Sequence, residues 1–110
     1  MIQDTISKIE ENIKNTQNIN DEKKEAILGL INSLKEEVIE LSKTNHEDAT
    51  TVANFTKVST HEATKSTKDE ELLGLSLKGL SQSVTKFEAS HPDLVAVVNS
   101  ICSSLSNSGF

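Results

Sequence analysis

The stretch that decides the fold is I-L-G-L-I-N-S-L-K-E-E-V-I-E-L, residues 27–41. Five of its apolar residues step by four, three, four and three positions, which places them on one stripe of an α-helix. Asn20 is a good N-cap, and Asp21 and Glu22 bring negative charge to the first turn, where it suits the helix dipole. We therefore expect a helix over residues 21–43, with its apolar stripe formed by Ile27, Ile31, Leu34, Val38 and Leu41.

The same coiled-coil-like rhythm recurs on both sides of this stretch. A first helix should end near Asn15, where N-T-Q-N-I-N brings in residues that prefer caps and turns. This short link favours an antiparallel hairpin, and no strand-like alternation competes with the helical pattern. The predicted fold is all-α, with antiparallel helical hairpins and about four to five helices. The remaining stripes are Ile2, Ile6, Ile9 and Ile13, then Leu73, Leu77, Leu80, Val84 and Phe87, then Leu94, Val98, Ile101 and Leu105.

The chain of 110 residues has the length of one domain. We expect an N-terminal helical hairpin over 1–43, a polar connector over 44–68 and a C-terminal helical hairpin over 69–110. The connector contains seven threonines and two serines, which lower helix propensity. A poorly anchored helix is favoured there over a disordered linker, with a weak face of Ala49, Val52, Ala53, Thr56, Ser59 and Ala63.

The composition argues against nucleic-acid binding. The net charge is −6, every basic residue is lysine, and Trp and Tyr are absent. The chain thus lacks both the bidentate arginine fork and most of the aromatic platforms used on nucleic acids. The single cysteine, Cys102, permits no internal disulfide, and no apolar run forms a signal peptide or approaches the ~20 residues of a membrane span. We expect a cytoplasmic protein without a membrane span.

Three histidines and one cysteine raise the question of a metal site. His46, His61, His91 and Cys102 include no close pair of the kind typical of zinc sites. His61 begins an H-E-x-x-H-like stretch, but Lys65 stands where the second ligand belongs. We expect no metal, no cofactor and no enzymatic activity, with Cys102 a small buried side chain. The alternative left open is a small metal- or ligand-binding regulatory module in which His61, His91 and Cys102 converge.

The most chemically varied stretch is F-E-A-S-H-P-D-L, residues 87–94. Glu88 and His91 suggest acid–base chemistry, but a junction between two helices explains the stretch more economically. Ser90 is the expected N-cap of the last helix, and Pro92 belongs in its first turn, where a missing N–H costs little. Whether Glu88 and His91 fasten this junction or face a partner stays open.

At this junction the sequence resembles a known family. The stretches S-T-H-E-A-T-K (59–65), E-L-L-G-L-S-L-K-G-L (71–80) and F-E-A-S-H-P-D-L-V-A-V-V-N-S-I-C-S-S-L-S-N-S-G-F (87–110) resemble the domain-of-unknown-function 4404 family of small bacterial proteins. The resemblance implies a small helical protein with no established activity, substrate or cofactor. A terminal Gly109 belongs to the pattern, and Phe110 departs from it because an aliphatic residue is expected. The positions that match the family signature are Phe87, Glu88, His91, Pro92 and Asn99.

Coiled-coil-like stripes bury fully only against other helices, so these patterns favour a protein that acts by binding other chains. About five thin helices leave surplus apolar surface, which a homodimer would cover. The partner is not identified by the sequence. The residues expected to be in surplus are Leu28, Leu72, Leu75 and Val95.

Overall fold

A computed structural model describes residues 1–107 of the chain. These residues form five α-helices and one short 3-10 helix, with no strand among them, so the all-α prediction is confirmed. The predictions made for Gly109 and Phe110 fall outside the described residues. The helices are α1 (Ile2–Asn15), α2 (Asp21–Ser42), α3 (His46–Thr64), α4 (Glu70–Val84), the 3-10 helix η1 (Thr85–Phe87) and α5 (Pro92–Ser106).

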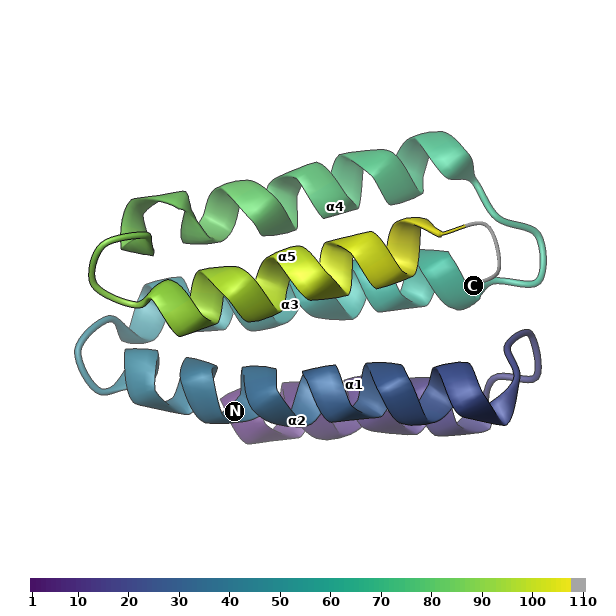
Figure 1. Ribbon diagram of the computed structural model, residues 1–110, viewed down its shortest axis with the longest axis horizontal. Coiled ribbons are helices and arrows are strands. Elements are labelled where there is room, and N and C mark those ends of the chain that lie inside the picture. The colour runs from purple at the N-terminus through teal and green to yellow at the C-terminus, as the bar shows by residue number, and fades with distance from the viewer. Residues whose placement is uncertain (108–110) are drawn as a thin grey trace.

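Consecutive helices run in opposite directions and pack as antiparallel neighbours (Figure 1). The predicted hairpins are present as α1–α2 and α4–α5. The two hairpins meet through α2 and α5, and α3 contacts all four other helices. No helix within residues 1–107 combines the length and the apolar character needed to cross a membrane.

The central position of α3 corrects the prediction of a poorly anchored helix. Its buried positions include Ala49, Ala53 and Ala63, and small side chains let neighbouring helices approach closely. Two buried threonines bond back to the helix: Thr56 Oγ1 donates to the Val52 carbonyl at 2.8 Å, and Thr64 Oγ1 donates to the Thr60 carbonyl at 2.8 Å. Tertiary packing thus overrides the low intrinsic propensity of this segment.

The predicted stripes form the core, with one difference in α4. Those of α1, α2 and α5 are wholly buried. In α4, Leu77 is only partly buried and Ser76 is buried in addition to the predicted leucines. The loop residue Ile19, which the periodic pattern did not include, also joins the core.

Candidate functional site

The turn between α4 and α5 holds the chemically varied stretch that the sequence singled out. The Phe87 ring is buried, and the backbone N–H of His91 donates to the Phe87 carbonyl at 2.8 Å. The two rings meet edge to face, with centroids 5.7 Å apart and planes at 87°. Phe87 and His91 therefore contact one another within the helix–turn–helix junction.

The predicted N-cap of α5 was wrong by one residue. His91 occupies the cap position and makes no side-chain cap hydrogen bond. Pro92 starts the helix, as expected from its missing N–H. Ser90 therefore lies one position too early to cap, and its hydroxyl instead lies 3.0 Å from His91 Nδ1.

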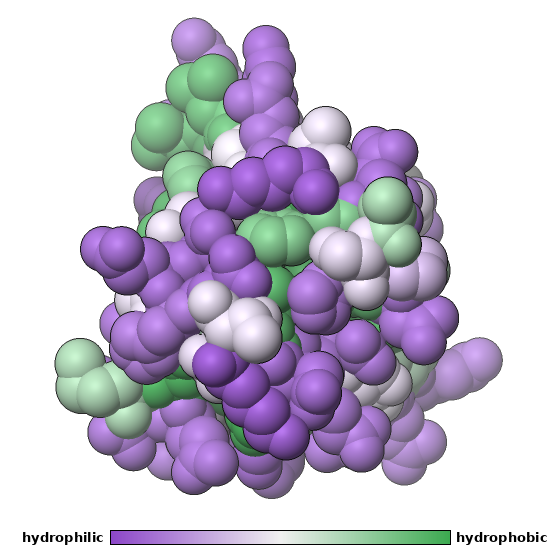
Figure 2. All heavy atoms as spheres, turned by 90° about the vertical axis from the view of Figure 1, so that its left-hand side faces the viewer, coloured by the Kyte–Doolittle hydropathy of each residue, from purple (hydrophilic) through white to green (hydrophobic). Residues whose placement is uncertain are grey.

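The other signature residues point to no shared site. Glu88, Pro92 and Asn99 are exposed, and Asn99 lies about two turns along α5 from the junction. An ion pair of 2.9 Å between Lys86 Nζ and Asp48 Oδ1 links the turn to α3. Figure 2 looks onto this end of the bundle and shows a mainly hydrophilic surface with small hydrophobic patches. The geometry here is that of a structural junction.

A second feature is an exposed apolar surface where α3 and α4 lie side by side. We call it the α3–α4 face and define it by Phe55, Val58, Leu72 and Leu75, which are 36%, 49%, 47% and 61% exposed. Leu72 and Leu75 stand three positions apart on α4, as Phe55 and Val58 do on α3, so each pair shares one side of its helix. The predicted surplus is thus confirmed for the two leucines, whereas Leu28 and Val95 are partly buried against the core.

Phe55 joins the two helices because it packs against a glycine. A Cβ built on Gly79 would lie 2.8 Å from Phe55 Cδ1 and 2.9 Å from Cζ, and would overlap Cε1. Nothing lies within 4 Å of the same atom built on Gly74. Close helix contact therefore explains Gly79, while Gly74 is simply tolerated in open space.

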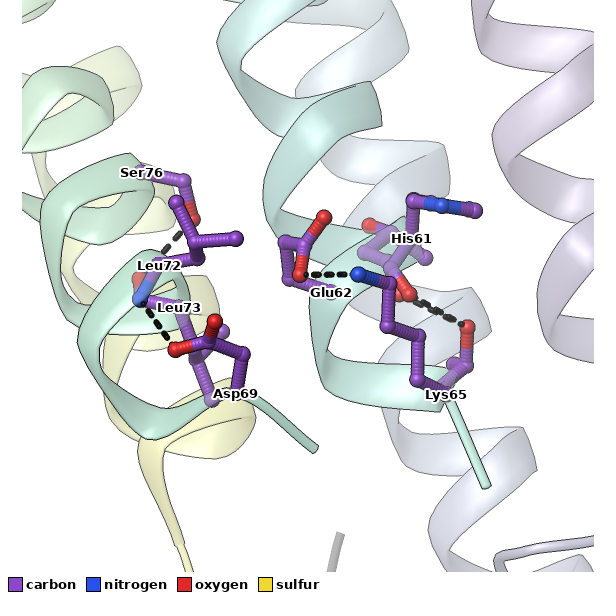
Figure 3. A network of polar contacts seen from close by, with 9 residues as sticks. His61, Glu62, Lys65, Asp69, Leu72, Leu73 and Ser76 are labelled. Atoms are coloured by element: carbon purple, nitrogen blue, oxygen red, sulfur yellow. Dashed lines mark hydrogen bonds and ion pairs between the residues drawn. The ribbon is translucent and has the colours of Figure 1, made fainter. Parts of the chain in front are cut away.

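The inner edge of the α3–α4 face is polar. Figure 3 shows Glu62 of α3 and Leu72 of α4 extending toward one another from the two helices. Glu62 is largely buried, and Lys65 Nζ lies 2.8 Å from its Oε1. The pairing is ionic, since Oε1 accepts no hydrogen bond of good geometry, and the buried Ser59 hydroxyl has no partner either. Buried polar groups of this kind are costly and restrict what can pack beside them.

The model of the family described as Domain of unknown function (DUF4404) matches residues 2–110. The chain belongs to the DUF4404 family. Neither curated proteins nor solved structures give a match in the corresponding comparisons. The family description carries no activity, so the DUF4404 membership identifies the chain without assigning a role to any residue.

The histidines and the cysteine of this DUF4404 chain are dispersed. No group of three His, Cys, Asp or Glu residues within 1–107 is placed to share a metal ion. The convergence of His61, His91 and Cys102 that the alternative reading requires does not occur. Cys102 Sγ lies 3.8 Å from the Leu77 carbonyl, and partial burial raises the pKa of the thiol. A raised pKa lowers the thiolate fraction, which is the opposite of what a nucleophile needs.

A third feature is an open groove on the outer surface between α1 and α3, which we call the α1–α3 groove. Its volume is about 570 Å³, and it is lined by Lys8, Ile9, Asn12, Asn54, Lys57, Val58 and His61. Val58 belongs to both this groove and the α3–α4 face. Sequence reasoning missed Phe55, Val58 and Lys57. The only available signal was that the large residues of α3 lie on a different side of the helix from its small residues.

Proposed function

We propose that this DUF4404 protein is a non-enzymatic helical protein that acts by self-association, with a second copy covering the α3–α4 face. The observation that carries the proposal is the exposure of four large apolar side chains on adjoining sides of two packed helices. An exposed apolar cluster of this kind is more informative than isolated surface leucines. Since every copy carries the same surface, a two-fold arrangement covers both at once.

The energy available sets the strength of the association. The exposed fractions of the four side chains add up to about two fully exposed residues, each worth ~1.5–3 kcal/mol on burial. A symmetric pair would therefore gain about 6–12 kcal/mol, against an association cost of ~4–15 kcal/mol. The net gain is at most about 8 kcal/mol, so the dissociation constant is no tighter than about 1 μM.

Sedimentation velocity across concentrations from about 1 μM to 1 mM tests the proposal. The unmodified chain should shift from monomer to dimer over this range. The double variant Val58→Asp/Leu75→Asp should stay monomeric, because covering a carboxylate with the apolar surface of a second copy is costly. The matched control Gln3→Asp/Ser81→Asp adds the same charge at exposed positions of α1 and α4 and should dimerise as the unmodified chain does.

Two results would count against self-association. One is a strict monomer at about 1 mM, at which the weakest useful association should already be visible. The other is a dimer that the Asp variants at Val58 and Leu75 leave intact, since another surface would then hold the two copies together. Circular dichroism of each variant keeps loss of fold separate from loss of contact.

A further inference from the structure

The α1–α3 groove gathers positive charge on an otherwise acidic molecule. Lys8 of α1 and Lys57 with His61 of α3 line it, together with two asparagine amides and no carboxylate. The chain as a whole carries a net charge of −6. The acids Asp4 and Glu11, one helical turn either side of Lys8, lie on α1 but outside the groove lining. A partner with negative charge is therefore favoured here over a neutral or basic one.

The groove also has an apolar floor with a regular geometry. Ile9 is almost fully buried at its base, and Val58 is half-exposed at its side. Lys57 and His61 stand one helical turn apart, so they form a line of nitrogen donors along α3. From Asn54 to His61 the α3 wall runs over seven residue steps, which is ~10 Å at ~1.5 Å per residue. This length matches about two turns of a bound helix.

We propose that the α1–α3 groove binds an acidic amphipathic helix of a different protein. Carboxylates on the two flanks of that helix meet Lys8 on the α1 wall and Lys57 on the α3 wall, and its apolar side chains lie over Val58. This is the helix-in-groove mode of recognition, in which apolar anchors supply contact area and flanking charges select the partner.

A second copy of the chain that docks groove to groove is the wrong occupant. Two grooves facing one another about a two-fold axis would bring Lys8 and Lys57 of one copy toward the same lysines of the other. Like charges in juxtaposition oppose such a contact. The groove proposal therefore does not depend on self-association through the α3–α4 face, although Val58 lies at the border of both surfaces.

The test uses nuclear magnetic resonance of the full chain labelled with ¹⁵N. The probe is a synthetic amphipathic Leu/Glu helix of about 18 residues (~27 Å), and the comparison peptide has the same leucines with Lys in place of Glu. The Leu/Glu peptide should shift the amide signals of the groove residues at low salt. Added salt should weaken this binding because its charge contacts are exposed.

Charge reversal provides the matched comparison. Lys8→Glu/Lys57→Glu should weaken binding of the Leu/Glu peptide about tenfold or more. Lys23→Glu/Lys78→Glu makes the same change in net charge on exposed lysines of α2 and α4, and should weaken it less than about threefold. The groove variant should leave the sedimentation behaviour of the chain as it is, so the two proposals fail or stand separately.

The proposal is overturned by any of four results. The first is an absence of amide shifts at about 1 mM peptide, and the second is a set of shifts that concentrate on Leu72 and Leu75 instead of the groove. The third is that both pairs of charge reversals weaken binding of the Leu/Glu peptide equally. The fourth is that the Leu/Lys peptide binds in the groove as well as the Leu/Glu peptide does. The third result would mean that net charge alone attracts the peptide. The second would assign the helix to the α3–α4 face.

Discussion

Replacing Gly79 by alanine tests the contact that joins α3 to α4. Alanine in a helix interior gains about 0.8–1 kcal/mol over glycine from intrinsic propensity. At Gly79 the new methyl group would overlap the Phe55 ring, and such overpacking costs about 1–3 kcal/mol. Gly74 is the matched control, because nothing lies within 4 Å of a Cβ there. Gly74→Ala should therefore stabilise the protein by about 1 kcal/mol, and Gly79→Ala should be neutral or destabilising.

Thermal and urea unfolding of the two variants measure this difference, which should amount to about 1–3 kcal/mol. For a domain of this size each kcal/mol moves the Tm by about 4 °C. In a Phe55→Ala background the clash is gone, so Gly79→Ala should then stabilise as much as Gly74→Ala does. Equal stabilisation by both alanines in the unmodified chain would refute the reasoning, because Phe55 would not be held against Gly79.

Two further predictions concern a helix cap and the cysteine. Asn20→Ala should lower the free energy of unfolding by about 1 kcal/mol, because the Asn20 side chain accepts a hydrogen bond from the Lys23 N–H at 2.9 Å. Ser90→Ala should change it by no more than about 0.5 kcal/mol, because Ser90 does not cap α5. Equal losses in the two variants would contradict this assignment. For Cys102, burial raises the thiol pKa, so its reaction with a thiol reagent should begin at higher pH in the folded than in the unfolded chain. Burial favours the neutral thiol over the thiolate, so the stability that burial supports should be complete below the unfolded pKa of about 8.5 and fall as pH rises through the folded pKa. Cys102→Ser should lack this fall. Equal thiol reactivity in the folded and unfolded chains would contradict the burial of Cys102.

Hydrophobic spacing predicted the fold class because four of the five helices carry large aliphatic residues at regular steps. Ile27, Ile31 and Leu34 need no knowledge of their neighbours to indicate a buried stripe. The same rule underrated α3, whose buried face consists mainly of Ala, Thr and Ser, with Val52 as its one large aliphatic residue. Small residues contribute little to a hydrophobic pattern, and their burial depends on where the other four helices lie.

The candidate surfaces were less accessible to sequence reasoning than the fold. Leu72 and Leu75 were recognised as surplus because they lie off the α4 stripe. The contact between Phe55 and Gly79 joins residues 24 positions apart, so the pairing of α3 with α4 must be known first. The Ser90 cap failed for a local reason: Ser90 and His91 are adjacent, and the sequence does not distinguish which of them leaves the helical conformation.

The central helix connects the fold to the proposed functions. On α3 the polar Thr56 is fully buried, while its neighbour Phe55 is more than one-third exposed. Packing against four helices explains why the inner positions are small, since large side chains would hold the neighbours apart. It does not explain why Val58 occupies an outer position, where a polar residue would serve the fold as well, or why Phe55, beyond its contact with Gly79, leaves more than one-third of its surface exposed. Apolar residues at outer positions stabilise the protein only when another surface covers them. Binding to a further chain is therefore the simplest account of why α3 has small polar residues inside and large apolar residues outside.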